Sequence, residues 1–239
     1  MFTGLTLLIP DKLDIERDAV ARAWEQGGGT VLRLDRFWSP PEVDRARVRL
    51  YGNDTFCLVL AQKLVLELVS PPDDLLLKVD PAWLRRELHG STLKQVVGET
   101  FPRFVKPLVP KIFRAGVWNA PEALLEECRG LEPQTPVLSA EVVSLRAEAR
   151  AFVLHGKVRA CALYEGEGNV AEAREFLSTV AHAAPLPRTC VLDAALVEGQ
   201  GWALLEANAT WGAGLNGCEP MEAASCIAAA TSAMPNGSG

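Results

Sequence analysis

Three residues with oxygen-bearing side chains lie close together near the end of the chain, where two apolar runs flank a Gly-Gln-Gly turn. Asp193 lies in the first run, VLDAALV, and Glu206 and Asn208 end the second, WALLEAN. Such runs predict an antiparallel pair of strands, on which Glu206 and Asn208 share a face and Asp193 can pair across to it. Two carboxylates and an amide favour Mg²⁺, which takes hard oxygen ligands and leaves room for phosphate oxygens. A hairpin with ordinary surface acids explains the spacing equally well.

Five charged residues upstream of this hairpin are spaced for binding an anionic ligand. Lys106 stands in FVKP, where a strand that stops at proline would present one ammonium to a cleft, and Lys111 follows in PKIF. Lysine supplies a compact charge for phosphate oxygens. Glu141 lies in SAEVV and Glu148 in EAR, and in an extended run Arg150 shares the face of Glu148 and can reach a phosphate or a carboxylate. A cross-strand surface pair of Glu148 and Arg150 remains the alternative.

The order of these motifs resembles that of the ATP-grasp ligases. The resemblance covers roughly Phe101 to Pro220, and within the superfamily the chain looks most like a small, divergent bacterial and phage clade with FVKP, SEPV-like, ExR and ExN motifs. It implies ATP and Mg²⁺, as two ions, for cofactors. One departure stands out, because the loop over the phosphates is usually rich in glycine and VPKIFRAGVW offers only Gly116.

The resemblance also implies roles for the single residues. Lys106 would contact the α-phosphate and the adenine edge, Lys111 the outer phosphates, Glu141 the adenine amine and Glu148 the ribose hydroxyls. The implied metal ligands are Asp193, Glu206 and Asn208; the implied nucleotide-binding residues are Lys106, Lys111, Glu141, Val142, Glu148 and Asn208; the implied catalytic residues are Arg150 and Lys111.

The expected fold class is α/β, with an α+β ATP-binding part. A strand (Leu5 to Pro10), a helix from about Asp14 to Gln26 and a strand after Gly27–Gly29 predict a β-α-β opening. The glycine run follows a helix and precedes a strand, which is the wrong context for a phosphate loop. We expect a small truncated Rossmann-like lobe over residues 1–72, an ATP-grasp region over 73–234 with two subdomains hinged near 139–142, and a disordered tail over 235–239.

Other segments give weaker signals. Val48 to Val69 predicts further strands, with Asn53-Asp54 as a turn, and a helix is expected from Asp80 through Leu88, carrying Arg86. A helical run is expected from Met221 to Met234. The preceding GAGLNG matches GxGxxG, but too little chain follows for a dinucleotide fold, so we expect a loop near the substrate.

Composition narrows the function classes. In 239 residues the net charge of −6 and pI near 5.2 argue against a general nucleic-acid surface. Without an N-terminal signal or a long apolar span, the expectation is a cytoplasmic protein that contacts no membrane. Six scattered cysteines predict free thiols, and three isolated histidines argue against a zinc site or a Ser-His-Asp triad.

The leading hypothesis is therefore an ATP- and Mg²⁺-dependent ligase that joins a carboxylate to an amine through an acyl phosphate and releases ADP. Its substrates would be small molecules or peptides, and the oligomeric state stays open, a dimer included. A non-catalytic ATP-binding module is the alternative. A third hypothesis comes from KVDP, which is similar to the motif of ligases that adenylate their own lysine, here Lys78.

Overall fold

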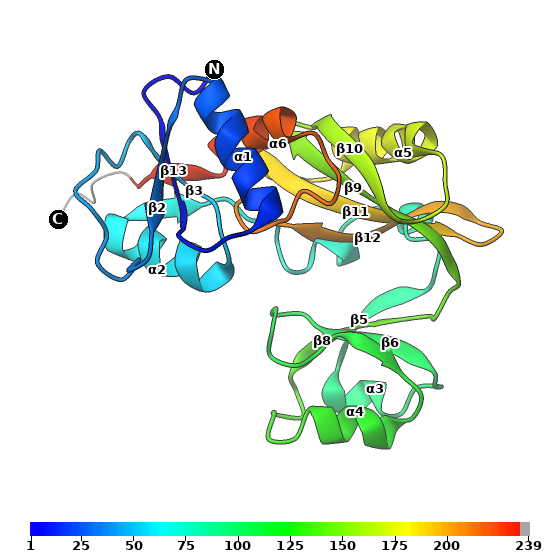
Figure 1. Cartoon of the computed structure of the whole chain (residues 1–239). Helices are drawn as coiled ribbons and strands as arrows, with labels where there is room; N and C mark the ends of the chain where they lie inside the picture. Colours follow the sequence, from blue (N-terminus) through cyan, green and yellow to red (C-terminus); the bar gives the residue numbers. More distant parts are fainter. Residues whose placement is uncertain (235–239) are drawn as a thin grey trace.

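The computed structural model describes residues 1–234, so the tail expected to be disordered, 235–239, lies outside the described residues. The first lobe contains a three-stranded parallel sheet of order β2-β1-β3, with the helices α1 and α2 (Figure 1). Its elements are β1 (Thr6–Pro10), α1 (Ile15–Gln26), β2 (Thr30–Leu34), β3 (Val48–Leu50), α2 (Asp54–Leu64) and β4 (Leu66–Leu68). The β-α-β opening predicted from the sequence is present.

The glycine run after α1 is explained by packing. The rings of Phe2 and Trp24 stack with centroids 4.2 Å apart, and both lie against the glycines. A Cβ added to Gly29 would meet Trp24 Nε1 at 2.2 Å, and one added to Gly27 would meet the Phe2 ring at 2.3 Å. Side chains at these two positions would displace a buried aromatic pair, which accounts for the glycines without any ligand.

The prediction of strands throughout Val48 to Val69 is wrong in its middle part, which is α2. Asn53, expected in a turn, is its N-cap: the side chain accepts a hydrogen bond from Phe56 N at 3.0 Å. The buried residues of α2 repeat at helical spacing; they are Phe56, Cys57, Leu60, Ala61 and Leu64. A continuous apolar run hides this period, since buried helices and buried strands read alike.

A small subdomain follows, with an antiparallel sheet of order β5-β8-β6-β7 covered by two short helices. Its elements are β5 (Leu88–Thr92), α3 (Leu93–Val96), β6 (Arg103–Pro107), β7 (Gly116–Trp118), α4 (Pro121–Glu127) and β8 (Pro136–Ala140). A polar network ties its strands together: Ser139 donates to Glu99 at 2.7 Å, Arg103 donates to Ser139 at 2.9 Å, and His89 lies 3.1 Å from Glu99.

The helix expected from Asp80 through Leu88 is also wrong. Single 3₁₀ turns, η1 (Leu75–Leu77) and η2 (Pro81–Trp83), precede a left-handed Arg85 and then β5. Arg85 at φ +51 breaks any continuation of the turn, because only an isolated residue adopts that conformation. Arg86 therefore lies in the connection between the bodies and not on a helix.

The large subdomain is an antiparallel sheet of order β10-β9-β11-β12, with α5 and α6 on one side (Figure 1). Its elements are β9 (Leu145–Leu154), β10 (Lys157–Gly166), α5 (Val170–Ala183), β11 (Thr189–Val197), β12 (Gly201–Asn208) and α6 (Pro220–Ala228). The helix expected to reach Met234 ends at Ala228, and the chain continues into β13 (Thr231–Ala233), which pairs with β4 of the first lobe.

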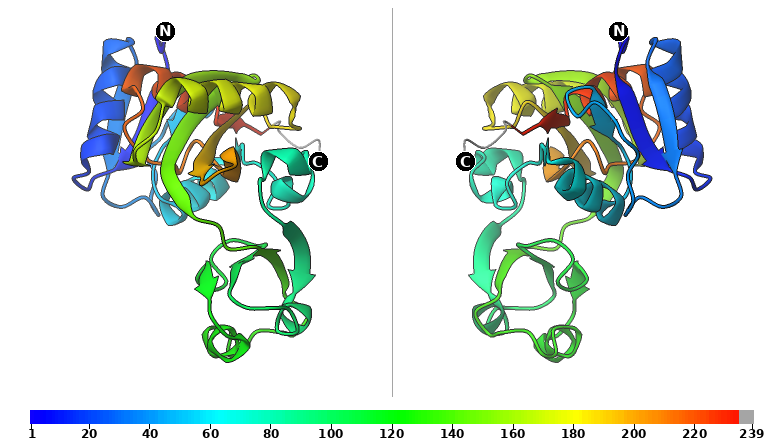
Figure 2. Two further views of the ribbon diagram at one scale, coloured as in Figure 1. Left: turned by 90° about the vertical axis from the view of Figure 1, so that its right-hand side faces the viewer. Right: turned by 90° about the vertical axis from the view of Figure 1, so that its left-hand side faces the viewer.

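The first lobe and the large subdomain form one body, from which the small subdomain extends (Figure 2). The chain passes between the two bodies twice, and the passages are hydrogen-bonded to each other: Glu141 N donates to Glu87 O at 2.9 Å, and Glu87 N donates to the Glu141 carboxylate at 3.3 Å. This pair of strands is a hinge next to the predicted 139–142. Within residues 1–234 no helix has the length and apolar character needed to span a bilayer.

Candidate active site

Three charged side chains form a row across three strands of the large sheet. Asp193 of β11 is the cross-strand partner of Arg150 on β9 and of Glu206 on β12. Directly opposed residues of an antiparallel sheet point to the same face, so the row projects from one side. A β-bulge follows, because the next pair joins Ala194 to Leu204 and leaves Leu205 between them. The hairpin predicted from the sequence is therefore present with its acids on one face.

Asp193 and Arg150 form a buried ion pair. Arg150 Nε and Nη2 donate to the two Asp193 oxygens at 2.8 and 2.7 Å, and the side chains are 12% and 2% exposed. Burial raises the pKa of the Asp193 carboxyl, and Arg150 opposes this rise without cancelling it. Burial by itself lowers the pKa of Arg150, but its hydrogen bonds with Asp193 raise it above the ordinary value. Each charge is thus retained by its partner.

The predicted metal ligands converge on one point. The Asn208 side-chain amide nitrogen donates to Asp193 Oδ2 at 3.0 Å and to Glu206 Oε1 at 2.8 Å. Oxygens of two carboxylates thus surround a position that an N–H group occupies, and a cation satisfies the same oxygens. Rotating the amide would present its oxygen instead. Within residues 1–234 no three His, Cys, Asp or Glu side chains are grouped for a metal, so Asn208 is needed as the third ligand. The donor set fits Mg²⁺.

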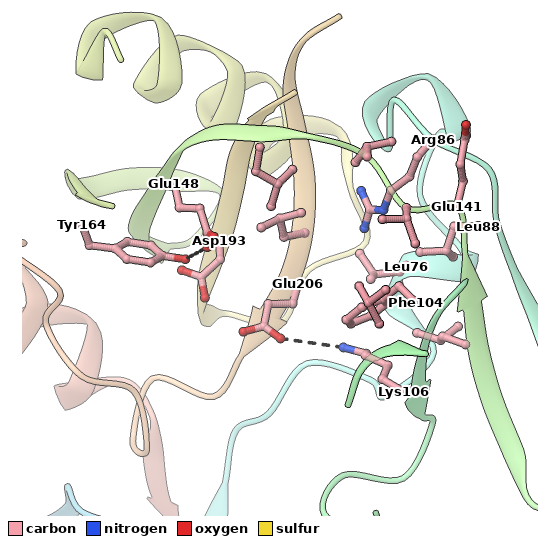
Figure 3. A pocket seen from close by; sticks show the side chains of 16 residues that line it. Leu76, Arg86, Leu88, Phe104, Lys106, Glu141, Glu148, Tyr164, Asp193 and Glu206 are labelled. Atoms are coloured by element: carbon pink, nitrogen blue, oxygen red, sulfur yellow. Dashed lines mark hydrogen bonds and ion pairs between the residues drawn. The ribbon is translucent and has the colours of Figure 1, made fainter. Parts of the chain in front are cut away.

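A cavity of about 300 Å³ lies between this face and the small subdomain (Figure 3). Six of the predicted residues line it: Lys106, Glu141, Val142, Glu148, Asp193 and Glu206. Its walls are otherwise mostly apolar, with Phe104, Leu88 and Leu138 from the small subdomain facing Leu205. Apolar walls with a few polar groups are typical of sites that bind a flat organic ring.

A second cavity, of about 620 Å³, adjoins the first. Lys106 and Glu206 line both, and Lys106 Nζ lies 3.8 Å from Glu206 Oε2. Asn208 and Arg150 line only the larger one. The two cavities therefore meet at a lysine and at a predicted metal ligand.

Two lysines are held elsewhere. Lys111, in the loop between β6 and β7, has φ +67 and is ion-paired with Asp54, the first residue of α2. Both line the larger cavity, so the structure brings Lys111 to the cleft but away from the metal-ligand row. Lys78 pairs with Asp74 at 2.7 Å, is half exposed and lines neither cavity.

Two residues of the smaller cavity had no assigned role in the sequence reading. Arg86, whose pKa is lowered by burial, donates from Nη1 to the backbone oxygens of Leu84 at 2.9 Å and Leu204 at 3.0 Å. Tyr164 donates to Glu148, and burial followed by this bond raises the pKa of its hydroxyl. Glu148 and Arg150 are thus not paired with each other. Arg86 adjoins a motif-free segment, and no local pattern marks Tyr164.

Two facing sheets of an ATP-grasp type, with a ring-sized cavity between them, define a nucleotide-binding enzyme class. An ATP-grasp domain family, the second family of its clade, matches residues 83–226. The chain belongs to this family, and it is an ATP-dependent ligase. The superfamily and fold predicted from the sequence are confirmed.

Solved structures share the fold. A RimK domain ATP-grasp protein from Sphaerobacter thermophilus DSM 20745 is 16% identical with a TM-score of 0.61, over 94% of this chain and 98% of that chain. The D-cycloserine synthetase DcsG is 14% identical with a TM-score of 0.58, over 95% and 99%. The ATP-grasp ligase PsnB, complexed with a minimal precursor, is 13% identical with a TM-score of 0.57, over 96% and 99%. No curated protein is significantly similar in sequence.

Proposed function

We propose that this protein joins a carboxylate to an amine at the expense of ATP, through an acyl phosphate, with release of ADP and phosphate. The observation that carries the proposal is the junction of the two cavities at Lys106 and Glu206, beside Asp193 and Asn208. A nucleoside fits the smaller, apolar cavity, and the larger cavity is left for the acceptor substrates. The phosphate chain then crosses the junction.

Each side chain of the smaller cavity has a task in this arrangement. The nucleobase packs between Phe104 and Leu205, and its polar edge meets the hinge at Glu141 and Val142. Glu148, held by Tyr164, accepts from the ribose hydroxyls. Arg86 supplies a second cation beside Lys106, because its Nε and Nη2 have no hydrogen-bond partner within residues 1–234. Both cations bind phosphate oxygens.

Asp193, Glu206 and Asn208 hold magnesium. When bound, Mg²⁺ neutralises the charge that develops on the phosphate oxygens during transfer. The substrate carboxylate attacks the γ-phosphorus, forming an O–P bond as the bond to ADP breaks. The amine then attacks the acyl carbon, losing a proton as phosphate leaves. Positioning supplies most of the catalysis, and no nucleophilic side chain takes part.

The substrate class follows only in outline. PsnB is described in complex with a precursor peptide, and DcsG as a D-cycloserine synthetase, so related folds take peptides as well as small molecules. We propose carboxylate and amine substrates of either kind. The 620 Å³ cavity has room for an amino acid or a short peptide segment.

One observation favours a non-catalytic ATP-binding module as a second candidate. Lys111, the only lysine of the glycine-poor loop, is engaged by Asp54. If the pair persisted with ATP bound, the outer phosphates would lack this cation and turnover would suffer.

Chromatography of labelled ATP incubated with the protein and a pool of amino acids and short peptides tests the proposal. We expect ADP and phosphate, formed only when a carboxylate and an amine are both present. AMP with label retained on the protein, and lost in Lys78→Ala, would instead show self-adenylation. Nucleotide binding without any product across the pool would favour the module.

A further inference from the structure

The loop that follows β12 is held from the first lobe. Glu16, in the first turn of α1, accepts hydrogen bonds from two successive backbone amides: Leu215 N at 3.0 Å and Asn216 N at 2.7 Å. The buried Tyr51 hydroxyl of the same lobe donates to Ala213 O at 3.0 Å. The first lobe thus fixes a loop nearly 200 residues away in the sequence.

Gly214 explains why this contact is possible. A Cβ at that position would lie 2.5 Å from Glu16 Oε2, well inside van der Waals contact. The backbone of Gly214 does not itself demand glycine, because its φ is outside the left-handed region. The absence of a side chain therefore serves the approach of the Glu16 carboxylate.

The loop is connected in turn to the row of charged residues. Arg150 Nη1 donates to Gly214 O at 3.0 Å, while its Nε and Nη2 donate to Asp193. Three hydrogen bonds fix the plane of this guanidinium, and one of them depends on the loop. Gly214 and Arg150 also line the larger cavity, whereas Glu16 lines neither cavity.

We propose that Glu16 is a positioning residue for the acceptor side of the site. By holding the amides of Leu215 and Asn216 it fixes Gly214 O, which sets the orientation of Arg150 against Asp193. Its effect is confined to the larger cavity and does not extend to the nucleoside cavity. The physical connection is independent of the reaction; only the word "acceptor" rests on the proposed function.

Glu16→Gln tests the connection, because the amide keeps the size of the side chain but offers one oxygen to two N–H groups. We expect amide hydrogen exchange at Leu215 and Asn216 to become about tenfold faster or more, since charge-assisted hydrogen bonds are lost. The NMR signal of the Arg150 Nε–H, assigned by its absence in Arg150→Lys, should shift or broaden. Affinity for ADP without magnesium, measured by calorimetry, should stay unchanged.

A matched control lies in the same helical turn. Asp18 also carries a carboxylate near the start of α1, but it pairs with Arg33 of β2 at 2.6 Å. Asp18→Asn should leave the loop amides and the Arg150 signal as they are in the parent, even if it lowers stability. A general loosening of the first lobe would affect both variants alike.

Gly214→Ala gives an independent route, since its Cβ would displace the Glu16 carboxylate. It should reproduce the Glu16→Gln pattern, and the double variant should add little to either single one. An Arg150 signal that does not move while the loop amides exchange faster would overturn the proposal and leave Glu16 as a simple anchor. Because none of these readouts needs turnover, they hold or fail independently of the ligase activity.

Discussion

Replacing Glu206 by glutamine separates metal binding from folding. The carboxylate is 43% exposed, its ion pair with Lys106 spans 3.8 Å, and glutamine keeps an oxygen for the Asn208 amide. A pair this exposed contributes at most about 1 kcal/mol. Its loss is offset by relief of repulsion, because the charge of Glu206 adds to burial in raising the pKa of Asp193. The ligand-free melting temperature should therefore change by no more than about 2–4 °C for a chain of this size.

The stabilisation by Mg·ATP should respond far more. A ligand at 100 times its Kd stabilises the folded state by about 2.7 kcal/mol. At this chain length that raises the melting temperature by roughly 5–10 °C. Losing one of two metal-binding carboxylates should weaken Mg·ATP binding by at least about tenfold, which removes about 1.4 kcal/mol. About 3–5 °C of the rise should then disappear, by the same scaling.

Thermal melting with and without Mg·ATP measures both effects. Glu198→Gln is the matched control, because it removes the same charge from an exposed position on the same hairpin. ADP in the presence of a chelator should shift the parent and Glu206→Gln equally. A full Mg·ATP shift in Glu206→Gln, or a large fall in its ligand-free melting temperature, would refute the assignment of Glu206 as a metal ligand and make it structural.

Two further predictions concern other parts of the small subdomain. Lys106→Ala should weaken binding of ATP in calorimetry without unfolding the protein, because the ammonium is partly exposed at the cavity junction; unchanged affinity would contradict its role. For Glu99, burial alone raises the pKa, but hydrogen bonds from Ser139 and His89 lower it below the ordinary 4.5. Its contribution to stability is therefore present above about pH 4.5 and lost as the pH falls through the lowered pKa of the folded state. Urea unfolding at several acidic pH values should show a weaker pH dependence for Glu99→Gln, and an identical dependence would disprove the link.

The geometry of the metal-ligand row could be predicted from the sequence because it depends on local rules. A period of two places Glu206 and Asn208 on one face, and a short turn brings Asp193 opposite. The lysine strand was found for a similar reason, since its proline marks where β6 ends. What each side chain binds remains a proposal.

Other features depend on contacts that no local rule contains. The Arg150 to Asp193 pair could be read only after β9 was known to lie beside β11, and Glu16 meets its loop across two lobes. Arg86 was placed on a helix because the positive φ of Arg85 leaves no mark in the sequence. Failures of this kind arise where tertiary packing overrides local propensity.

The double passage between the bodies has a consequence for how the ligands influence each other. The chain crosses at Glu87 and Glu141, whose backbones are bonded together, so rotation of the small subdomain is favoured about a single axis. Lys106 rides on that subdomain and borders both cavities, so one rotation reshapes the two together. A nucleotide that favours the closed angle prepares the neighbouring chamber for its occupant, and by thermodynamic reciprocity the occupant tightens the hold on the nucleotide.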